Sequence, residues 1–460
     1  MNYLDFLHSK EIKYDPCGFE TDEVNPKLFE WQSAIVRWAL IKGKCAIFAD
    51  CGLGKTAMQL QWAKMVSKHT GKPVLILAPL AVARQTREEG EKFDVEVTVC
   101  RKQEDVHSGV NIANYEMLDH FDADAFSGVV LDESSILKDS TSATRKALTE
   151  KFEKTGYKLC CTATPSPNDF VELGTHAQFL GVMTQPEMLS TFFCHDGGNT
   201  SQWRLKGHAE SKFFEWVASW ACCLTNPEDL GYDGSDFVLP ELRVHEIITN
   251  SNNLEDSDGQ MMLIPLTSQS LNERRAARRN SLEDRIEAAA NIANSFSSQV
   301  LVWCDLNSES ESLSQAIHGA VEVKGSNTPD YKETAMNGFS SGDVRVLVSK
   351  PSIAGWGMNW QQCNKMIFVG LSDSFEAYYQ AVRRCWRFGQ KKPVDVYIVI
   401  SDAEGCVKSN IERKQSDAQR MTSELVKYTK DILTAEINHT VRMSESYITI
   451  ERMEVPAWIA

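Results

Sequence analysis

The stretch ADCGLGKT, residues 49–56, decides how the rest of the chain is interpreted. It follows the apolar run 45–48, which predicts a buried strand, and it precedes residues 57–63, which have a helical pattern. A strand, a glycine loop and a helix in this order form a phosphate-binding loop. Backbone N–H groups in such a loop turn inward around an anion, and the start of the helix adds positive partial charge.

Each side chain of this loop has an expected task. Gly52 and Gly54 allow the backbone to turn around the phosphates. Lys55 is expected to contact the β- and γ-phosphates, and Thr56 is expected to bind Mg²⁺. Ala49 stands where such loops commonly have glycine, and it keeps a small residue at the turn. The loop therefore predicts ATP and Mg²⁺ as cofactors.

Composition bounds the class of protein. A chain of 460 residues is long enough for two or three domains. The net charge of −15 argues against a surface coated in positive charge, but it leaves room for a local basic groove. The 13 cysteines include no Cys-x-x-Cys pair, so reduced thiols in a cytoplasmic protein are the simplest interpretation. No apolar run reaches the ~18 residues of a membrane span, and no secretory signal is expected.

Strands and helices alternate in two blocks, and both blocks predict the same kind of sheet. The expected strands are 45–48, 74–79, 95–99, 110–114, 129–131 and 158–162 in the first block, and 300–303, 321–323, 344–348, 366–369 and 394–400 in the second. Strands that are apolar on both faces and alternate with helices indicate a parallel sheet covered on each side. The fold class is therefore α/β, with two lobes that are expected to be distant copies of one fold.

The same alternation sets the expected domain boundaries. The predicted units are a lead-in at 1–25, a first, ATP-binding lobe at 26–184, an insertion or linker at 185–280, a second lobe at 281–405 and a helical tail at 406–460. The insertion is rich in aromatic residues and turn signals, so we expect it to be irregular and partly helical. Apolar spacings of three, four and seven in the tail fit one face of a long helix. We expect this helix to brace the lobes, with a partner-binding coiled coil as the alternative.

Two acidic residues follow the expected strand 129–131. Asp132 and Glu133 stand at its carboxyl end, which is the edge where open α/β sheets bind ligands. Asp132 can hold Mg²⁺ through water, and Glu133 can orient and deprotonate an attacking water. The alternative is an acid pair that caps a neighbouring helix. The phosphate-binding loop upstream favours the catalytic interpretation.

A basic cluster lies near the end of the second block, in residues 380–390. Arg384 and Arg387 are three positions apart, so they share one face of a helix. Two guanidinium groups on one face can stabilise the charge that builds on a transferring γ-phosphate. The alternative is a solvated basic face.

These motifs, in this order, resemble the superfamily-2 helicases. The resemblance is strongest to the Swi/Snf-like branch of double-stranded DNA translocases, in the compact form found in phages and bacteria, and it covers about residues 26–180 and 283–400. It implies two RecA-like lobes that hydrolyse ATP between them. Motif II carries Ser134 and Ser135 where many relatives have Ala-Asp or Ala-His, which leaves the acids intact but changes the position that usually links motif II to motif III.

The resemblance also implies roles for further residues, each through the motif that it matches. The positions are Gln32 as the adenine-reading glutamine, Gly357 and Asn359 at the ATP site, Thr162, Thr164 and Gln380 in coupling ATP state to domain movement, and Arg84, Gln85, Asn114 and Lys350 against nucleic acid. Lys55, Glu133, Arg384 and Arg387 are the implied catalytic residues.

The predicted insertion carries two weaker signals. Trp203 and Arg204 mix aromatic and basic character and could touch DNA, although core packing of the tryptophan explains it equally well. Four cysteines and histidines could supply a zinc site, although their spacing matches no standard pattern. They are Cys194, His195, His208 and Cys222.

Three functions are compatible with these residues. The leading hypothesis is an ATP-driven translocase or remodeller on double-stranded DNA, because the two lobes would close on ATP and reopen after hydrolysis. The second is a helicase that separates strands of DNA or RNA, and the third is a scaffold that uses ATP only as a switch. We expect DNA as the partner, with replication or recombination proteins as candidate partners, and a cytoplasmic monomer in a bacterial or phage-infected cell.

Overall fold

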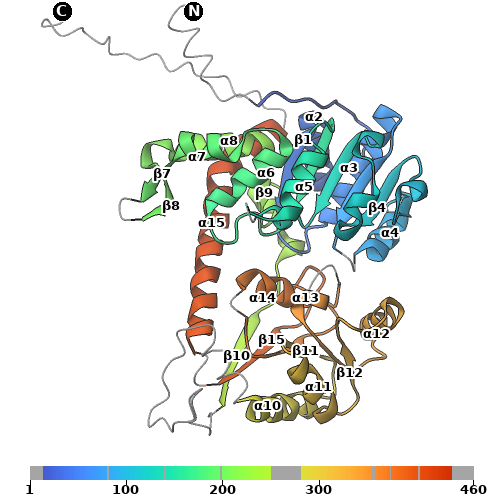
Figure 1. The fold of residues 1–460 in the computed structure, drawn as a ribbon, viewed down its shortest axis with the longest axis vertical. Helices are drawn as coiled ribbons and strands as arrows, with labels where there is room; N and C mark the ends of the chain where they lie inside the picture. The colour runs from blue at the N-terminus through green and yellow to red at the C-terminus, as the bar shows by residue number, and fades with distance from the viewer. Residues whose placement is uncertain are drawn as a thin grey trace, which may run out of the picture.

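The computed structural model describes residues 14–79, 82–138, 141–196, 199–249, 281–354, 358–372, 374–401 and 405–437. These residues form two lobes, each with its own parallel sheet and helices on both faces (Figure 1). The fold class predicted from the sequence is confirmed. None of the helices in these ranges is long and apolar enough to cross a membrane.

The sheet of the first lobe has seven strands, and every neighbouring pair is parallel. In spatial order they are β3 (Val97–Val99), β4 (Val110–Asn114), β2 (Val74–Ala78), β5 (Gly128–Asp132), β6 (Tyr157–Cys161), β1 (Lys44–Ala49) and β9 (Ala221–Leu224). Successive side chains of a strand point to opposite faces of the sheet, and both faces of β1 are buried. The loop that follows β1 therefore starts from a strand held inside the lobe.

Helices cover both faces of this sheet. On one face Cys45 and Ile47 pack with α2 (Glu30–Lys42) and α3 (Lys55–Thr70), and α4 (Ala83–Lys92) lies beside α3. On the other face Ala46 and Phe48 belong to a second apolar cluster. That cluster is completed by α5 (Ala143–Lys151), α6 (Leu173–Leu180), α7 (Gln185–Phe192) and α8 (Glu210–Trp220).

The region expected to be an irregular insertion, 185–280, contributes a strand to each sheet. Its described part contains α7, a hairpin of β7 (Phe193–Asp196) and β8 (Asn199–Leu205), and then α8. Strand β9 then pairs with β1 in the first lobe, and β10 (Leu242–Thr249) pairs with β15 (Val394–Ser401) in the second. The exact limits of the domains remain a prediction, but 185–249 is more regular than we expected.

In the described part of the second lobe the sheet has six strands, and its neighbouring strands are again parallel. Their order is β10, β15, β14 (Lys365–Val369), β11 (Val300–Cys304), β13 (Val346–Ser349) and β12 (Ala320–Val323). Its helices are α10 (Leu282–Ser295), α11 (Asn307–Ala316), α12 (Pro329–Ser341), α13 (Pro351–Ala354) and α14 (Phe375–Val382). The predicted basic cluster therefore begins in α14 and continues past its end.

The C-terminal helix, α15 (Gly405–Ile437), has 33 residues and reaches from the second lobe to the first (Figure 1). Its apolar residues Leu425 and Leu433 are buried in the core of the first lobe. Near its end, Glu436 accepts a hydrogen bond of 2.9 Å from the indole of Trp38 and forms an ion pair of 3.1 Å with Lys42. The tail helix expected from the sequence is present and packs on the first lobe.

Candidate nucleotide-binding site between the lobes

The phosphate-binding loop has the backbone that its glycines predict. Gly52 has φ +91° and Gly54 has φ +72°, both in the left-handed region that favours glycine. A Cβ on Gly52 would lie 2.8 Å from the backbone nitrogen of Phe388, so glycine also lets the second lobe approach the loop. Lys55, at the first position of α3, donates to the carbonyls of Ala49 (2.8 Å) and Asp50 (3.3 Å).

Gln32 lies under this loop. It is buried, its side-chain nitrogen donates to the carbonyl of Leu53 at 3.0 Å, and its oxygen accepts from the backbone of Phe29 at 3.1 Å. The glutamine therefore connects the start of α2 to the loop. Its reading of adenine remains a prediction, but its position beside the loop is compatible with that role.

The two acids lie at the carboxyl end of β5, as predicted. Asp132 is buried, one carboxylate oxygen accepts from Gln59 at 2.7 Å, and its carbonyl accepts from the hydroxyl of Tyr115 at 2.8 Å. Glu133 has φ +55° and ψ +56°, a left-handed conformation that is uncommon outside glycine. Its carboxylate accepts from Thr162 at 3.4 Å, so motif II contacts motif III directly.

Burial raises the pKa of both Asp132 and Glu133, and the positive charge of Lys55 acts in the opposite direction on each. Arg384, from the other lobe, also lowers both pKa values. Its charge therefore reaches the acids across the seam between the lobes. A buried carboxylate opposed by cations from two lobes is typical of a catalytic centre.

The oxygen donors at this site fit Mg²⁺. The hydroxyl of Thr56 lies in the first turn of α3, and the carboxylate of Asp132 lies beside that helix through its bond to Gln59. Within the described ranges no three His, Cys, Asp or Glu side chains gather as a metal site. Mg²⁺ takes one or two protein oxygens and completes its shell with phosphates and water, so the hydroxyl of Thr56 and the carboxylate of Asp132 would suffice to hold it.

Behind motif II lies a polar contact that sequence reasoning missed. The hydroxyl of Ser134 lies 3.2 Å from Nε2 of His176 in α6, and both residues are fully buried. The other ring nitrogen lies 3.4 Å from the carbonyl of Glu172. Burial lowers the pKa of His176 to about 4. The imidazole is therefore neutral at pH 7 and links motif II to the helix that follows motif III.

This histidine should make stability depend on pH. His176 has a pKa lowered from 6.5 to about 4, so the unfolded state binds more protons than the folded state between these values. Its contribution is fully present above pH 6.5 and is lost as the pH falls toward 4. Between pH 7 and pH 4 we expect the wild type to lose about 3 kcal/mol more than His176→Gln.

Denaturant unfolding of the first lobe at pH 7, 5.5 and 4 measures this difference. His208→Gln is the matched control, because His208 is exposed and should leave the pH dependence unchanged. Parallel stability curves for the wild type and His176→Gln would contradict the assignment.

The structure brings the two predicted arginines to the seam between the lobes. Arg384 is buried and donates to the carbonyl (2.9 Å) and side-chain oxygen (2.8 Å) of Gln380 and to the carbonyl of Met358 (3.2 Å). Arg387 donates to the same Met358 carbonyl at 3.4 Å. Among the described residues, neither guanidinium has a carboxylate partner. Burial and the charge of Arg384 lower the pKa of Arg387 to about 10.

The remaining residues predicted at the ATP site and in motif III differ in whether they are described and in how buried they are. Gly357 and the side chain of Arg84 lie outside the described residues, whereas Asn359 is exposed next to Met358. In motif III, the buried Thr164 donates its backbone N–H to the hydroxyl of Thr162 at 3.1 Å. Motif III is therefore internally connected as well as bound to Glu133.

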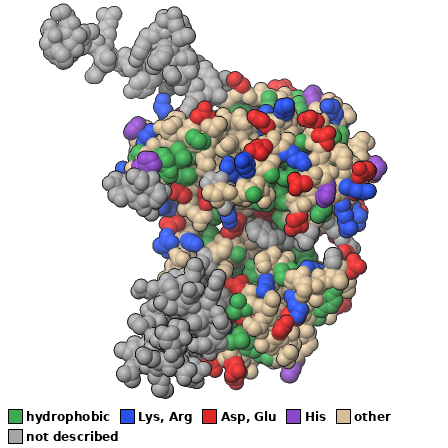
Figure 2. Space-filling model, viewed as in Figure 1, with side chains coloured by type: hydrophobic (Ala, Val, Ile, Leu, Met, Phe, Trp, Pro, Cys, Tyr) green, Lys and Arg blue, Asp and Glu red, His purple; other side chains and the backbone are tan. Residues whose placement is uncertain are grey.

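The residues predicted to touch nucleic acid come from several elements of both lobes, and their contact with nucleic acid remains a prediction. Gln85 lies in α4, Asn114 ends β4, and Lys350 follows β13 in the other lobe. Trp203 and Arg204 lie on the β7–β8 hairpin, which projects from the first lobe (Figure 1). Acidic and basic side chains are interspersed on the face shown in Figure 2, so that face carries no single large basic area.

The zinc hypothesis is not supported by the described residues. Cys222 is buried in β9, within the core of the first lobe, whereas Cys194 and His195 lie on the projecting hairpin. The ring of His195 packs against Trp203, with ring centroids 3.9 Å apart. Cys222 therefore takes part in core packing, and the ring of His195 packs on the hairpin.

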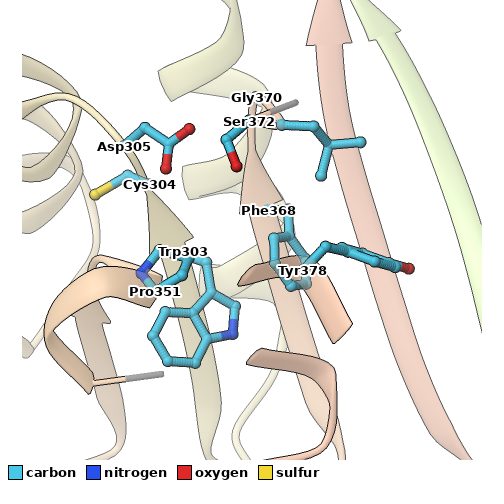
Figure 3. Close-up of a pocket in the computed structure, with 9 residues that line it drawn as sticks. Trp303, Cys304, Asp305, Pro351, Phe368, Gly370, Ser372 and Tyr378 are labelled. Carbon is cyan, nitrogen blue, oxygen red and sulfur yellow. The ribbon is translucent and has the colours of Figure 1, made fainter. Parts of the chain in front are cut away.

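Two hollows lie outside the loop and the pair of acids just described. One, of about 10 Å³, lies at the carboxyl ends of β11 and β14, where Asp305 and Ser372 surround it (Figure 3). It suits one water molecule and is far too small for a nucleotide. The other, of about 560 Å³, is lined by Lys72 and Lys154 at the amino ends of the first sheet. Ligands of open α/β sheets bind at the opposite, carboxyl edge.

Comparison with known proteins agrees with this geometry. Residues 31–192 match the model of the SNF2-related domain, and residues 283–389 match that of the helicase conserved C-terminal domain. The chain is 22% identical over 435 residues to the DNA annealing helicase and endonuclease ZRANB3 of Mus musculus, covering 85% of this chain and 40% of that protein. It is 35% identical over 83 residues to the bifunctional helicase and thymine dioxygenase JBP2 of Leishmania braziliensis, covering 18% of this chain and 8% of that one.

Among solved structures, the Sulfolobus solfataricus SWI2/SNF2 ATPase core in complex with dsDNA aligns over 93% of this chain and 99% of that chain, with 17% identity and a TM-score of 0.41. The chain spans less than half the length of ZRANB3 and JBP2, the two curated relatives named above. The two family models fall on the two lobes that carry the acids and the arginines. The chain therefore belongs to the Snf2-like branch of the superfamily-2 helicases.

Proposed function

We propose that this chain is an ATP-hydrolysing motor that moves along double-stranded DNA. One observation carries the proposal: Arg384 and Arg387 lie at the seam without a carboxylate partner among the described residues, and the charge of Arg384 reaches Asp132 and Glu133 in the other lobe. Buried guanidinium groups are costly unless an anion pairs with them. The γ-phosphate of ATP, held by the loop of the first lobe, would supply that anion.

The residues of the first lobe prepare the attack. Lys55 would bind the β- and γ-phosphates, while Thr56 and Asp132 would hold Mg²⁺, which supplies charge neutralisation on the phosphate oxygens. Glu133 would orient a water molecule and take its proton on the carboxylate. Arg384 would stabilise the charge that develops on the γ-phosphate oxygens.

Movement would follow from the same contacts. The bond of Thr162 to Glu133 would report the state of the site to motif III, and closure of the lobes would shift their grip on DNA. Contacts to DNA phosphates would make binding weakly sequence-selective and strongly salt-dependent. We propose duplex DNA as the track because the described strands of the second lobe are all parallel, with no hairpin placed to separate strands.

Hydrolysis of ATP with and without nucleic acid tests the motor. We expect the rate to rise when duplex DNA is added, and the DNA affinity to fall as salt increases. A triplex-displacement assay beside a fork-unwinding assay distinguishes the two motor functions, and we expect displacement without unwinding. Equal hydrolysis with and without nucleic acid would contradict the proposal and favour a scaffold switched by ATP.

A further inference from the structure

A cluster of contacts joins the phosphate-binding loop to the second lobe through side chains to which the sequence motifs assign no role. Arg383 is buried and forms an ion pair with the carboxylate of Asp50. It also donates to the carbonyl of Cys51 at 2.9 Å. The hydroxyl of Tyr379, one turn earlier, donates to the other oxygen of the same carboxylate. Two side chains of the second lobe therefore hold one carboxylate in the loop of the first.

The surroundings favour this pairing over solvation. The guanidinium of Arg383 lies 5.0 Å from the ring centroid of Trp386 and 5.7 Å from that of Tyr379. Stacking on aromatic faces and an ion pair together offset the cost of burying a cation. Burial alone would lower the pKa of Arg383, but the negative charge of Asp50 outweighs it and keeps that pKa above its usual value, so the guanidinium stays charged.

The position of the contact gives it a mechanical consequence. Tyr379, Arg383 and Arg387 are each four residues apart, and Arg384 follows Arg383 directly. Backbone hydrogen bonds continue the turn past α14, from Arg383 to Tyr379 (3.0 Å) and from Trp386 to Val382 (3.0 Å). Because Arg383 is held on the loop, the rotation of this turn about its axis is fixed. The distance of Arg384 and Arg387 from the phosphates is then fixed as well.

A second ion pair joins the lobes nearby. Lys138, which follows motif II, pairs with Glu376 in the first turn of α14. This pair holds the start of α14, whereas Arg383 holds its end. A helix fixed at both ends cannot rotate about either contact. The two pairs together therefore fix one position of Arg384 and Arg387 relative to the loop, which we call their register.

We propose that Arg383 and Tyr379 are positioning residues, which clasp Asp50 and so set the register in which Arg384 and Arg387 meet the transferring phosphate. We call this contact the Asp50 clasp; the inference rests on the proposed function for its catalytic consequence. Losing the clasp should lower kcat, because the arginines no longer face the acids. Binding of nucleotide to the loop of the first lobe should change little.

A double-mutant cycle tests the clasp. We expect Asp50→Asn and Arg383→Gln each to lower kcat about tenfold, and the double variant to lose about tenfold rather than about a hundredfold, because each change removes the same contact. The Kd of a fluorescent ATP analogue should change less than about twofold in all three. Arg383→Lys should recover part of kcat, since it keeps the ion pair and loses the bond to Cys51.

Tyr379→Phe tests the same contact with little risk of misfolding, because it removes only a hydroxyl. We expect it to lower kcat about threefold. Tyr331→Phe and Arg101→Gln are the matched controls, since both residues are exposed, and both should keep wild-type kcat. A double variant that loses the product of the two single losses would overturn the clasp, as would a nucleotide affinity that falls in step with kcat.

Hydrogen–deuterium exchange separates this proposal from the function on which it rests. The loop amides of residues 49–56 should exchange faster in Asp50→Asn and Arg383→Gln, and no faster still in the double variant. That readout needs no ATP. A wild type that fails to hydrolyse ATP with DNA would end the motor proposal and leave the clasp to be judged by exchange, whereas unchanged loop exchange in both single variants would refute the clasp.

Discussion

Glu133→Gln is expected to lower kcat for ATP hydrolysis by about 10²–10⁴-fold, because an amide cannot take the proton of the attacking water. The substitution keeps the shape of the side chain and its distance from Thr162. Burial raises the pKa of Glu133, so the folded protein pays to ionise it, and a neutral amide should not lower the melting temperature. Binding of a fluorescent ATP analogue should persist, because Lys55 and the loop are unchanged.

Steady-state hydrolysis with saturating duplex DNA, together with thermal denaturation, checks this result. Glu150→Gln is the matched control, since Glu150 is exposed on α5 and pairs with its helix neighbour Lys146. A Glu133→Gln variant that keeps more than about a tenth of the activity would remove Glu133 from the role of general base. Loss of nucleotide binding in the same variant would point to a binding role instead.

The parts of the fold that could be predicted from the sequence are those with local signals. The loop at 49–56, the acids at the end of β5 and most strands are marked by apolar runs and by residue spacing. Strand β9 was missed because its four residues, within an aromatic-rich stretch, show no periodicity of their own. It becomes a strand only because β1 offers it an open edge.

The missed residues of the site share one property, which is that their partners are distant in the chain. Ser134 meets His176 across 42 positions, and Tyr379 meets Asp50 across 329. No spacing rule links such pairs, because the contact is set by the packing of whole elements. The predicted arginines were found from their spacing of three, which suggested one helix face, although α14 ends at Val382 and both arginines lie in the turns beyond it. Arg383, between Gln380 and Arg384 in the same motif, points to a different partner.

Arg387→Ala is expected to change activity and stability in opposite directions. Among the described residues its guanidinium makes one long hydrogen bond, to the carbonyl of Met358, and burial and the charge of Arg384 lower its pKa to about 10. Removing it relieves that repulsion, so the melting temperature should rise or stay constant. The transition state should lose a cation from the γ-phosphate, and kcat should fall about 10³-fold or more, as for other arginines in this role.

Two measurements on one preparation decide the matter: thermal denaturation without ligand, and DNA-stimulated hydrolysis at saturating ATP. Arg420→Ala, on the exposed side of α15, is the control for loss of an arginine and should alter neither. Arg387→Lys should restore charge without the planar fork that matches phosphate oxygens, so most of kcat should stay lost. If Arg387→Ala keeps wild-type kcat, the charge opposite Glu133 comes from Arg384 alone. If Arg387→Ala instead has a much lower melting temperature than the wild type, Arg387 stabilises the seam, and repulsion between the two guanidinium groups is not the dominant effect there.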